Sequence, residues 1–315
     1  MQLSEHRNKW VVTVDGRRYS TGLDATTSNR AAAERKAGEI IATLAKPVGD
    51  TIGEIMAAYL RDKDQTALAP DRLHFAWKRL KPFFASAREA DITRDACRRY
   101  AAQRDVQPAT INKELRTLRA AIRWANPQSV AVVETLPEPQ PRDRFLSRDE
   151  FARLLDASRE TFHLTVFLHL AIATAGRKEA LLDLTWMQVR WDRDEIYLGH
   201  KANGKKRATV PMTASLKAAL QTAKDIAQTE HVIEYNGAKV KNVRTAFAAA
   251  CRRAGIEGLH IHDLRHTAAV WMCERGIPLE KISAFLGHSD IRVTQQVYAR
   301  HQPDHLRDAA DALEL

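Results

Sequence analysis

Hydrophobic and polar positions divide the first half of the chain into a β-prone unit and a helical unit. Residues 10–23 alternate around Asp15-Gly16, and a D-G pair between alternating residues predicts a two-residue hairpin. Residues 29–45 then repeat apolar positions at helical spacing. From residue 51 to residue 133 every readable pattern is helical, with apolar stripes three and four residues apart. The pattern predicts a hairpin with one helix, followed by a helical bundle.

A proline-rich segment precedes the second half. Residues 135–144 read TLPEPQPRDR, and prolines among alternating polar residues resist helix and sheet, so we expect an extended linker. Ser147 and Glu150 then form a capping-box pattern, which indicates the start of a new domain. Helices dominate that domain, apart from a β-like interruption at residues 196–211. The expected fold class is α+β, mainly α with small β-sheets.

Composition indicates a basic protein with no membrane contact. The 315 residues include 49 Lys and Arg against 39 Asp and Glu, a formal net charge of +10. This surplus favours a polyanionic partner, because each cation that meets a phosphate releases condensed counterions. Cys97, Cys251 and Cys273 lie far apart with no C-x-x-C, which argues against a disulfide framework or a cysteine zinc site. No apolar run reaches ~18 residues and no signal-peptide core is visible, so we expect a cytoplasmic protein.

One helix of the first half carries cations along a single face. Its apolar side is formed by residues such as Ile111, Leu115 and Leu118. Its other side carries, at three- and four-residue steps, Lys113, Arg116, Arg119 and Arg123. In isolation such a face is more often merely solvated. The net charge and the motifs downstream shift the interpretation toward DNA contact.

Two cationic motifs open the chemistry of the second half. Arg177 stands where an apolar helix ends at Gly176, and its planar fork of donors suits a phosphate. Residues 196–211 then predict a hairpin that turns at Asn203-Gly204. The hairpin carries four cations, Lys201 at its rim and Lys205, Lys206 and Arg207 beyond. A flexible hairpin lysine can enter a DNA groove and donate a proton, although each cation taken alone also fits a plain surface.

His262 and Arg265 lie three residues apart near the start of a helix. That end of a helix favours an anion through its free N–H groups and its dipole. The rival interpretation is a zinc hydrolase site built from four neighbouring ligand types, His260, His262, Asp263 and His266. It is the weaker hypothesis, because the sequence offers no other convincing ligand group.

The fourth motif is L-G-H-S at residues 286–289, with Tyr298 beyond it. Gly287 is expected to end one helix and Ser289 to cap the next, with His288 between them. A lone tyrosine at Tyr298 usually serves packing. With a histidine and two arginines available, it can also act as a nucleophile.

The order of these motifs resembles the tyrosine recombinase, or phage integrase, family. The matching positions are Arg177, Lys201, His262, Arg265, His288 and Tyr298. Residues 109–125 are similar to the last helix of that family's core-binding domain, and the N-terminal hairpin unit looks like its arm-type DNA-binding domain. The resemblance therefore covers the whole chain. It implies an arm-type domain at residues 1–46, a helical core-binding (SAM-like) domain at 50–135 and a catalytic domain at 142–315.

Two positions depart from the family's pattern. The family usually has a glutamate three residues after the first arginine, where this chain has Ala180, with Glu179 one place earlier. This leaves open how Arg177 is supported. The hairpin is also slightly longer than usual between its lysine and its proline. Lys205 therefore remains a second candidate for the catalytic lysine.

The resemblance implies an enzyme, a DNA strand transferase with phosphoryl transfer like that of type IB topoisomerases. In the reaction that the resemblance implies, Tyr298 attacks the scissile phosphate and leaves a 3′-phosphotyrosine and a free 5′-hydroxyl. Arg177 and Arg265 clamp the phosphate, and His288 hydrogen-bonds it. His262 is the general base and Lys201 the general acid. No metal, ATP or other cofactor is implied.

The resemblance also implies the partners of the protein. They are double-stranded DNA at attachment sites and, because two duplexes need four active sites, a homotetramer on that DNA. A DNA-bending accessory protein and an excisionase are further implied partners, in a bacterial cytosol and near the nucleoid. An apolar pattern after Tyr298 is expected to form a helix that docks on a neighbouring subunit, through Leu306, Ala309, Ala310 and Leu313.

The hairpin unit at residues 1–46 favours a phage or prophage integrase, which integrates and excises DNA. The alternatives within the family are a chromosome-dimer resolvase, which typically lacks such a unit, and a transposon recombinase. From a different class, the chain could be a DNA-binding regulator without catalysis. The complete set of six polar residues argues against that reading, because a mere binder has no need of Tyr298.

Overall fold

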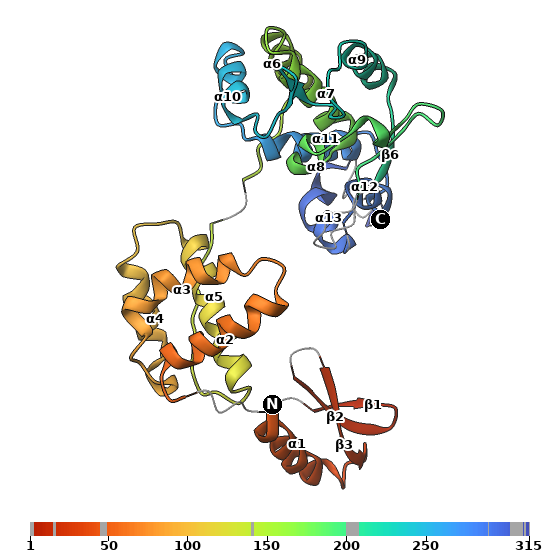
Figure 1. Cartoon of the computed structure of the whole chain (residues 1–315). Helices are drawn as coiled ribbons and strands as arrows, with labels where there is room; N and C mark the ends of the chain where they lie inside the picture. Colours follow the sequence, from red (N-terminus) through yellow and green to blue (C-terminus); the bar gives the residue numbers. More distant parts are fainter. Residues whose placement is uncertain are drawn as a thin grey trace. The chain divides into compact units, whose positions relative to one another are not determined.

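The structure is a computed structural model, and it describes residues 3–14, 17–44, 49–139, 142–199, 208–288, 290–302, 311 and 313–314. The chain divides into two compact units, Met1–Gln140 and Pro141–Leu315 (Figure 1). Among the described helices, none combines the length and the apolar character that crossing a bilayer requires.

The N-terminal segment is a small antiparallel sheet covered by one helix. The sheet contains β1 (Leu3–His6), β2 (Lys9–Val14) and β3 (Arg17–Asp24) in that order, and α1 (Arg30–Leu44) follows. Val12 packs against Ala37 and Ile41 of α1 and forms a small core. The predicted strands and helix are confirmed, whereas the turn at Asp15-Gly16 lies outside the described residues.

Strand β1 was not predicted from the pattern of residues. It turns into β2 through Arg7 and Asn8, both with positive φ, 50° and 61°. Asparagine tolerates this left-handed conformation better than other residues with a side chain, but no glycine marks the turn. A hairpin whose turn lacks glycine has little local sequence signature, so the sequence pattern does not predict β1.

Residues 50–125 form the expected helical unit. Its elements are α2 (Ile52–Thr66), α3 (Asp71–Phe84), the 3₁₀ turn η1 (Glu89–Asp91), α4 (Arg94–Ala102) and α5 (Pro108–Ala125). Thr51 caps α2 by accepting a hydrogen bond from the Glu54 amide, and Pro108 occupies the first turn of α5, where a missing N–H costs nothing. The stripes of α2, α3 and α5 meet in one core that includes Met56, Leu80 and Leu115.

A buried carboxylate lies inside this helical unit. Glu114 is 6% exposed, and it accepts hydrogen bonds of 2.6 Å from the Tyr100 hydroxyl and 2.8 Å from Arg104. Burial, and then the bond to Glu114, raise the pKa of Tyr100. A buried charge needs partners of this kind, because desolvation would otherwise cost several kcal/mol.

The chain around the start of the proline-rich segment is held on α4 and α5. The Asn112 amide donates 2.9 Å to the Leu136 carbonyl and accepts 2.7 Å from the Leu136 amide. Arg98 pairs with Glu134 at 2.8 Å. The described residues after α5 form neither helix nor strand, as expected, but up to residue 138 they are fixed by side-chain contacts.

The second unit is mainly helical with two small sheets. Its helices are α6 (Arg148–Ala157), α7 (Phe162–Thr174), α8 (Lys178–Leu182), α9 (Ala214–Asp225), α10 (Arg244–Arg253), α11 (Ile261–Glu274), α12 (Leu279–Leu286) and α13 (Ile291–Tyr298). The shorter elements are η2 (Trp186–Gln188), β4 (Val189–Arg190), β5 (Glu195–Tyr197), β6 (Thr209–Pro211), β7 (Glu234–Tyr235), β8 (Ala238–Lys239) and η3 (Ala299–His301). The expected fold class, mainly α with small β-sheets, is confirmed.

Helix α7 forms the centre of this unit. It is apolar on nearly every side, and α9 and α11 pack against it. Leu164, Phe167 and Leu168 are at most 1% exposed. The predicted capping box of Ser147 and Glu150 is present at the start of α6. All three cysteines are free and buried.

Candidate active site

Arg177 stands at a sharp break between two helices. Helix α7 ends at Thr174, and Ala175 adopts a left-handed conformation with φ of 48°. Arg177 then has an extended backbone and precedes α8. This reversal leaves the arginine partly exposed at the rim of the unit. The predicted helix break at Gly176–Arg177 is therefore confirmed.

Arg265 connects that break to a second motif. Its side chain is 6% exposed, and it donates 2.7 Å hydrogen bonds to the carbonyls of Ala175 and Leu286. Burial, and then the positive charge of Arg177, lower the pKa of Arg265 to about 10, so it stays charged at neutral pH. These two bonds leave further guanidinium N–H groups for an anion.

The two histidines among the candidate site residues, His262 and His288, share one electrostatic environment. The imidazole of His288 is partly buried, with Nδ1 2.8 Å from the Thr294 hydroxyl, whereas His262 is exposed. Burial, followed by Arg265 and Arg177, lowers the pKa of His288 to about 4. Although His262 as a whole is exposed, desolvation of its imidazole, followed by the charge of Arg265, lowers the pKa of His262 as well. Both imidazoles are therefore neutral near pH 7.

Tyr298 is the last residue of α13 and is 7% exposed. It belongs to a buried cluster with Ala268 and Ile282, and its ring centroid lies 5.3 Å from that of His266. Burial raises the pKa of Tyr298 to about 12, against the lowering effect of Arg265. The phenol therefore needs a base before it can act as a nucleophile near neutral pH.

The turn that precedes α13 differs from the prediction in one residue. Gly287 ends α12 with φ of 64°, as expected for a glycine C-cap. The N-cap of α13 is Asp290, whose carboxylate accepts a 3.0 Å bond from the Arg292 amide. The expectation that Ser289 caps α13 was wrong, because aspartate one residue later serves the same function. Ser289 itself lies outside the described residues.

The position of the family's usual glutamate is occupied by a core residue. Ala180 is 2% exposed on α8. Glu179 is exposed, and its carboxylate lies 3.4 Å from Lys178 Nζ. The carboxylate nearest to that position in this chain therefore faces outward.

The predicted hairpin is described only at its base. Strands β5 and β6 pair antiparallel, and the Leu198 amide donates 3.3 Å to the Ala208 carbonyl. Strand β4, which the sequence did not indicate, adds a third strand. The turn and its cations lie outside the described residues, namely Lys201, Lys205, Lys206 and Arg207.

The cations of α5 are not equivalent. Lys113 and Arg123 are exposed. Arg116 is exposed too, but pairs with Glu138 at 2.8 Å. Arg119 donates a hydrogen bond to the Val133 carbonyl. The sequence placed all four on one face without showing that Arg116 and Arg119 hold the chain that follows α5.

A hollow of about 850 Å³ opens beside Arg177 and His262. Arg244 and Arg252 of α10 also line it. These two arginines were not among the sequence-based candidates, although their spacing of eight residues puts them on one helix face. Lys178 and His260 line the hollow as well, beside two carboxylates, Glu179 and Glu257. Cations are therefore in excess at this surface, which suits a polyanion.

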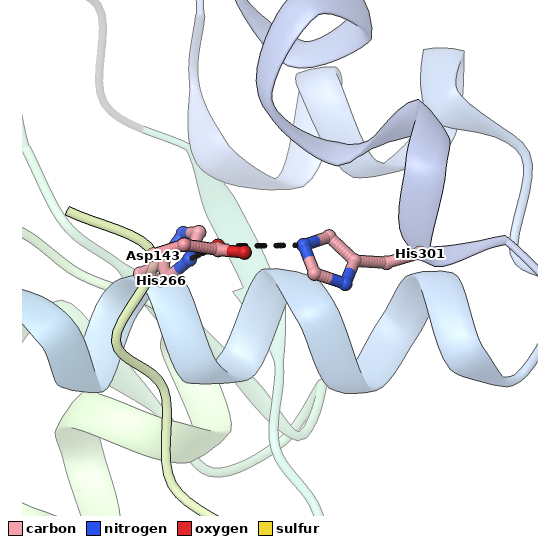
Figure 2. A group of neighbouring side chains, drawn as sticks. All are labelled: Asp143, His266 and His301. Atoms are coloured by element: carbon pink, nitrogen blue, oxygen red, sulfur yellow. Dashed lines mark hydrogen bonds and ion pairs between the residues drawn. The ribbon is translucent and has the colours of Figure 1, made fainter. Parts of the chain in front are cut away.

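The rival zinc cluster is not assembled as proposed. His260 is contacted by Arg142, with 2.6 Å between Arg142 Nη1 and His260 Nδ1, and Asp263 accepts a 2.8 Å bond from the His260 amide. The ligand-type side chains that do converge in the described part of the chain are Asp143, His266 and His301 (Figure 2).

Comparisons with known proteins identify the family of this chain. Residues 144–305, more than half of the chain, match the family described as the Phage integrase family. The integrase of Salmonella phage P22 is 29% identical over 209 residues, which cover 61% of this chain and 53% of that protein. Tyrosine recombinase XerC of Oceanobacillus iheyensis is 24% identical over 280 residues, which cover 81% and 85%.

Solved structures share the fold at low identity. A lambda integrase dimer bound to a COC′ core site matches with a TM-score of 0.64 and 18% identity, over 97% of this chain and 95% of that one. The Tn1549 transposon integrase in complex with circular intermediate DNA matches with a TM-score of 0.68 and 18% identity, over 83% and 99%.

The fold and the arranged residues define a protein of the integrase type. The chain belongs to the Phage integrase family. Its match spans about half the length of the first curated relatives, 53%, 60% and 46% of those proteins.

Proposed function

We propose that this chain is a site-specific tyrosine recombinase that cuts and rejoins double-stranded DNA through a covalent bond from Tyr298 to a backbone phosphate. One observation carries the proposal. Arg265 donates hydrogen bonds to the residue two places before Arg177 and to the residue two places before His288. It also acts electrostatically on the Tyr298 phenol. A single buried cation therefore unites the family's scattered motifs.

The charges around the site fit phosphoryl transfer. The Tyr298 oxygen attacks phosphorus, the bond to the 5′-oxygen breaks, and negative charge develops on the non-bridging oxygens. Arg177 and Arg265 stabilise that charge through charge-assisted hydrogen bonds. His262 is neutral near pH 7 and can accept the phenol proton. Lys201, or Lys205, gives a proton to the departing 5′-oxygen, and His288 contacts the phosphate.

Binding of DNA follows from the distribution of cations. We assign residues 142–315 to catalysis, 50–135 to contact with the core of the site and 1–46 to separate arm-type sites. Exposed Lys113 and Arg123, together with Arg244 and Arg252 beside the hollow, are the proposed backbone contacts. Because two duplexes are exchanged, the active assembly is a homotetramer on DNA. A DNA-bending protein and an excisionase are the proposed accessory partners.

Among the subtypes, we favour a phage or prophage integrase. Support comes from the three-stranded sheet with its helix at residues 3–44, a size of element that can enter a DNA groove. Arg17 and Arg18 are exposed on β3. Replacing both by alanine should abolish binding to flanking arm sites and leave binding to the core site intact. If the double variant keeps both its binding to arm sites and its binding to the core site, a chromosome-dimer resolvase or a transposon recombinase would be favoured instead.

A suicide DNA substrate, nicked beside the cleavage point, tests the chemistry. The released short strand diffuses away, so the covalent protein–DNA adduct accumulates and is counted on a denaturing gel. The adduct should form with the wild type and vanish in Tyr298→Phe. Tyr235→Phe is the matched control, since Tyr235 is 61% exposed in the same unit. An adduct that persists in Tyr298→Phe would refute the assigned nucleophile.

A further inference from the structure

One carboxylate gathers three nitrogen-bearing side chains next to Tyr298. Asp143 Oδ1 lies 2.8 Å from Arg300 Nη2, 3.2 Å from His266 Nε2 and 3.6 Å from His301 Nε2. Figure 2 shows the carboxylate with the two imidazoles. We call Asp143, His266, Arg300 and His301 the Asp143 cluster.

The Asp143 cluster holds Tyr298 in two ways. Arg300 and His301 are the second and third residues after the tyrosine, within η3. His266 touches it from the side, with ring centroids 5.3 Å apart and an interplanar angle of 34°. The carboxylate therefore restrains both the backbone beyond the phenol and the ring that packs on it. The side chains of His266 and His301 are each 13% exposed, whereas those of Asp143 and Arg300 are 38% and 58% exposed, so the imidazoles are shielded and the carboxylate lies at the surface.

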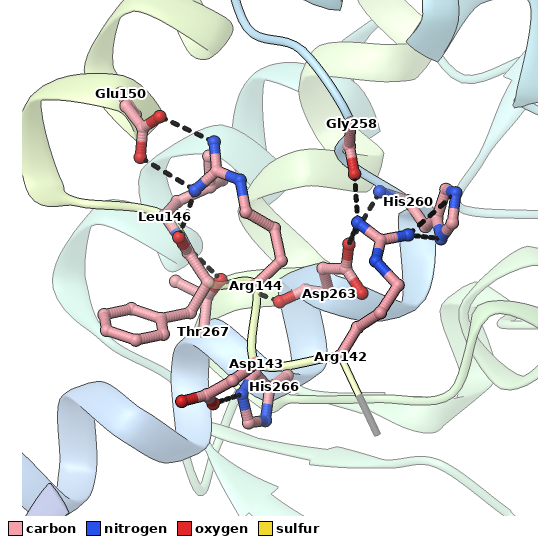
Figure 3. Close-up of polar contacts among 11 residues, drawn as sticks. Arg142, Asp143, Arg144, Leu146, Glu150, Gly258, His260, Asp263, His266 and Thr267 are labelled. Carbon is pink, nitrogen blue, oxygen red and sulfur yellow. Dashed lines mark hydrogen bonds and ion pairs between the residues drawn. The ribbon is translucent and has the colours of Figure 1, made fainter. Parts of the chain in front are cut away.

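Asp143 belongs to a short segment that hydrogen bonds fix to the rest of its domain. The Leu146 amide donates 3.0 Å to the Thr267 hydroxyl, and Trp271 donates 3.0 Å to the Leu146 carbonyl. Figure 3 shows Arg142 reaching Gly258 on one side and Arg144 reaching Glu150 on the other. Residues 142–146 thus lie fixed along α11, where the chain leaves the proline-rich segment.

We propose that Asp143 is a positioning residue for Tyr298, which ties the end of the proline-rich segment to the chain just beyond the nucleophile. By holding Arg300 and His301, it keeps the phenol beside Arg265 of its own subunit. The inference rests on the proposed role of Tyr298 and adds to it a link between the interdomain segment and the nucleophile. A change in that segment on DNA binding is then transmitted to the tyrosine through one side chain.

One aspartate and two histidines can also suggest a divalent metal, and the Asp143 cluster has suitable ligand types. The ion-pair interpretation is favoured because the Arg300 guanidinium already balances the charge on the same oxygen. Partial burial acts to raise the pKa of Asp143, but the bond from His266 and the charges of Arg300 and His301 outweigh it and lower the pKa. The carboxylate is thus ionised and already paired with the Arg300 guanidinium.

Hydrogen–deuterium exchange on the full chain tests the contact without catalysis. In Asp143→Ala, amides of residues 298–302 should exchange at least about threefold faster, because the segment loses its ion pairs. Asp156→Ala is the matched control, since it removes an exposed carboxylate that pairs with Arg159 away from Tyr298. Unchanged exchange in Asp143→Ala would overturn the proposal.

The suicide substrate then tests positioning. Asp143→Ala should lower the rate of adduct formation about tenfold, since a small misplacement of a nucleophile is costly. Affinity for the DNA should stay within about twofold, because Asp143 contacts no proposed DNA-binding cation. Asp143→Glu should recover part of the rate. In an Arg300→Ala, His301→Ala background, Asp143→Ala should have a smaller effect than in the wild type, because only its contact with His266 is left to lose.

The outcomes separate this inference from the proposed function. If the wild type forms no adduct, the proposed function fails, and the exchange experiment still decides whether Asp143 holds residues 298–302. If the wild type reacts and Asp143→Ala matches it in rate and exchange, only the positioning role fails. Stoichiometric zinc binding to the wild type, abolished in His301→Ala, would also overturn it, because a metal would then replace Arg300 as the partner.

Discussion

The guanidinium of Arg265 donates a 2.7 Å hydrogen bond to the carbonyl of Ala175, a residue held in the left-handed conformation with φ of 48°. An equal bond of 2.7 Å reaches the carbonyl of Leu286. The cation proposed to bind a phosphate thus also joins the ends of α7 and α12. Its catalytic and structural roles are therefore expected to be inseparable on substitution.

Arg265→Lys should damage both roles even though it keeps the charge. A lysine cannot span two carbonyls with a planar fork, so one buried carbonyl loses its donor at a cost of about 1–3 kcal/mol in the free energy of unfolding. Adduct formation on the suicide substrate should fall about a hundredfold or more. Arg275→Lys, an exposed arginine after the same helix, is the control. Equal rates for the two variants would contradict the phosphate role of Arg265.

Local signals made the helix ends predictable. Gly176, Gly287 and the Ser147–Glu150 box each act within a few residues of chain, so their roles are readable without knowledge of the fold. The order of the family motifs likewise needs only the sequence. These features gave the fold class and the list of candidate site residues.

Contacts between distant parts of the chain were not readable. The sequence placed His262 and Arg265 on one helix face, yet His262 is exposed and Arg265 is 6% exposed. Arg265 is buried because two carbonyls from other helices receive it. The Asp143–Arg300 pair likewise depends on η3 returning to the start of the domain. The periodicity of apolar and polar residues along the chain predicts neither contact.

The buried carboxylate of the helical unit gives a second prediction. Glu114→Ala should lower the free energy of unfolding of that unit by about 3–5 kcal/mol, because Arg104 and the Tyr100 hydroxyl lose their buried partner. Glu138→Ala removes an exposed carboxylate from Arg116 on the same helix and should cost about 1 kcal/mol or less. Hydrogen exchange of α4 and α5 in the full chain measures both. Comparable losses would show that burial does not set the cost.

Acid should weaken the fold through His288. The folded-state pKa of about 4 lies below the ordinary value of 6.5, so between these pH values the unfolded chain binds a proton that the folded chain does not. The free energy of unfolding contributed by this site is therefore lost as pH falls from 6.5 toward 4, and levels off below. Above 6.5 both states are neutral at this site.

His288→Asn should remove this pH dependence, because asparagine does not titrate and can keep a bond to Thr294. Urea denaturation at pH 8 and at pH 4.5 measures the effect, with the pH 8 values as reference. The wild type should lose more stability between the two conditions than His288→Asn does. An equal loss in both proteins would mean that other groups carry the acid sensitivity.

The cations of α5 should separate into DNA contacts and structural contacts. Arg123 is exposed, and a lost phosphate contact should reduce the slope of log affinity against log salt by about 0.9. Arg123→Ala should therefore lower the slope and leave stability unchanged.

Arg119 instead donates to the Val133 carbonyl, so Arg119→Ala should cost about 1 kcal/mol in stability and leave the slope nearly constant. Arg116→Ala should lie between them, because it frees Glu138 as well as removing a cation. Salt titrations of core-site binding measure the slope for each of the three variants. An equal reduction of the slope in all three would mean that the contacts of Arg116 and Arg119 with the chain after α5 break when DNA binds.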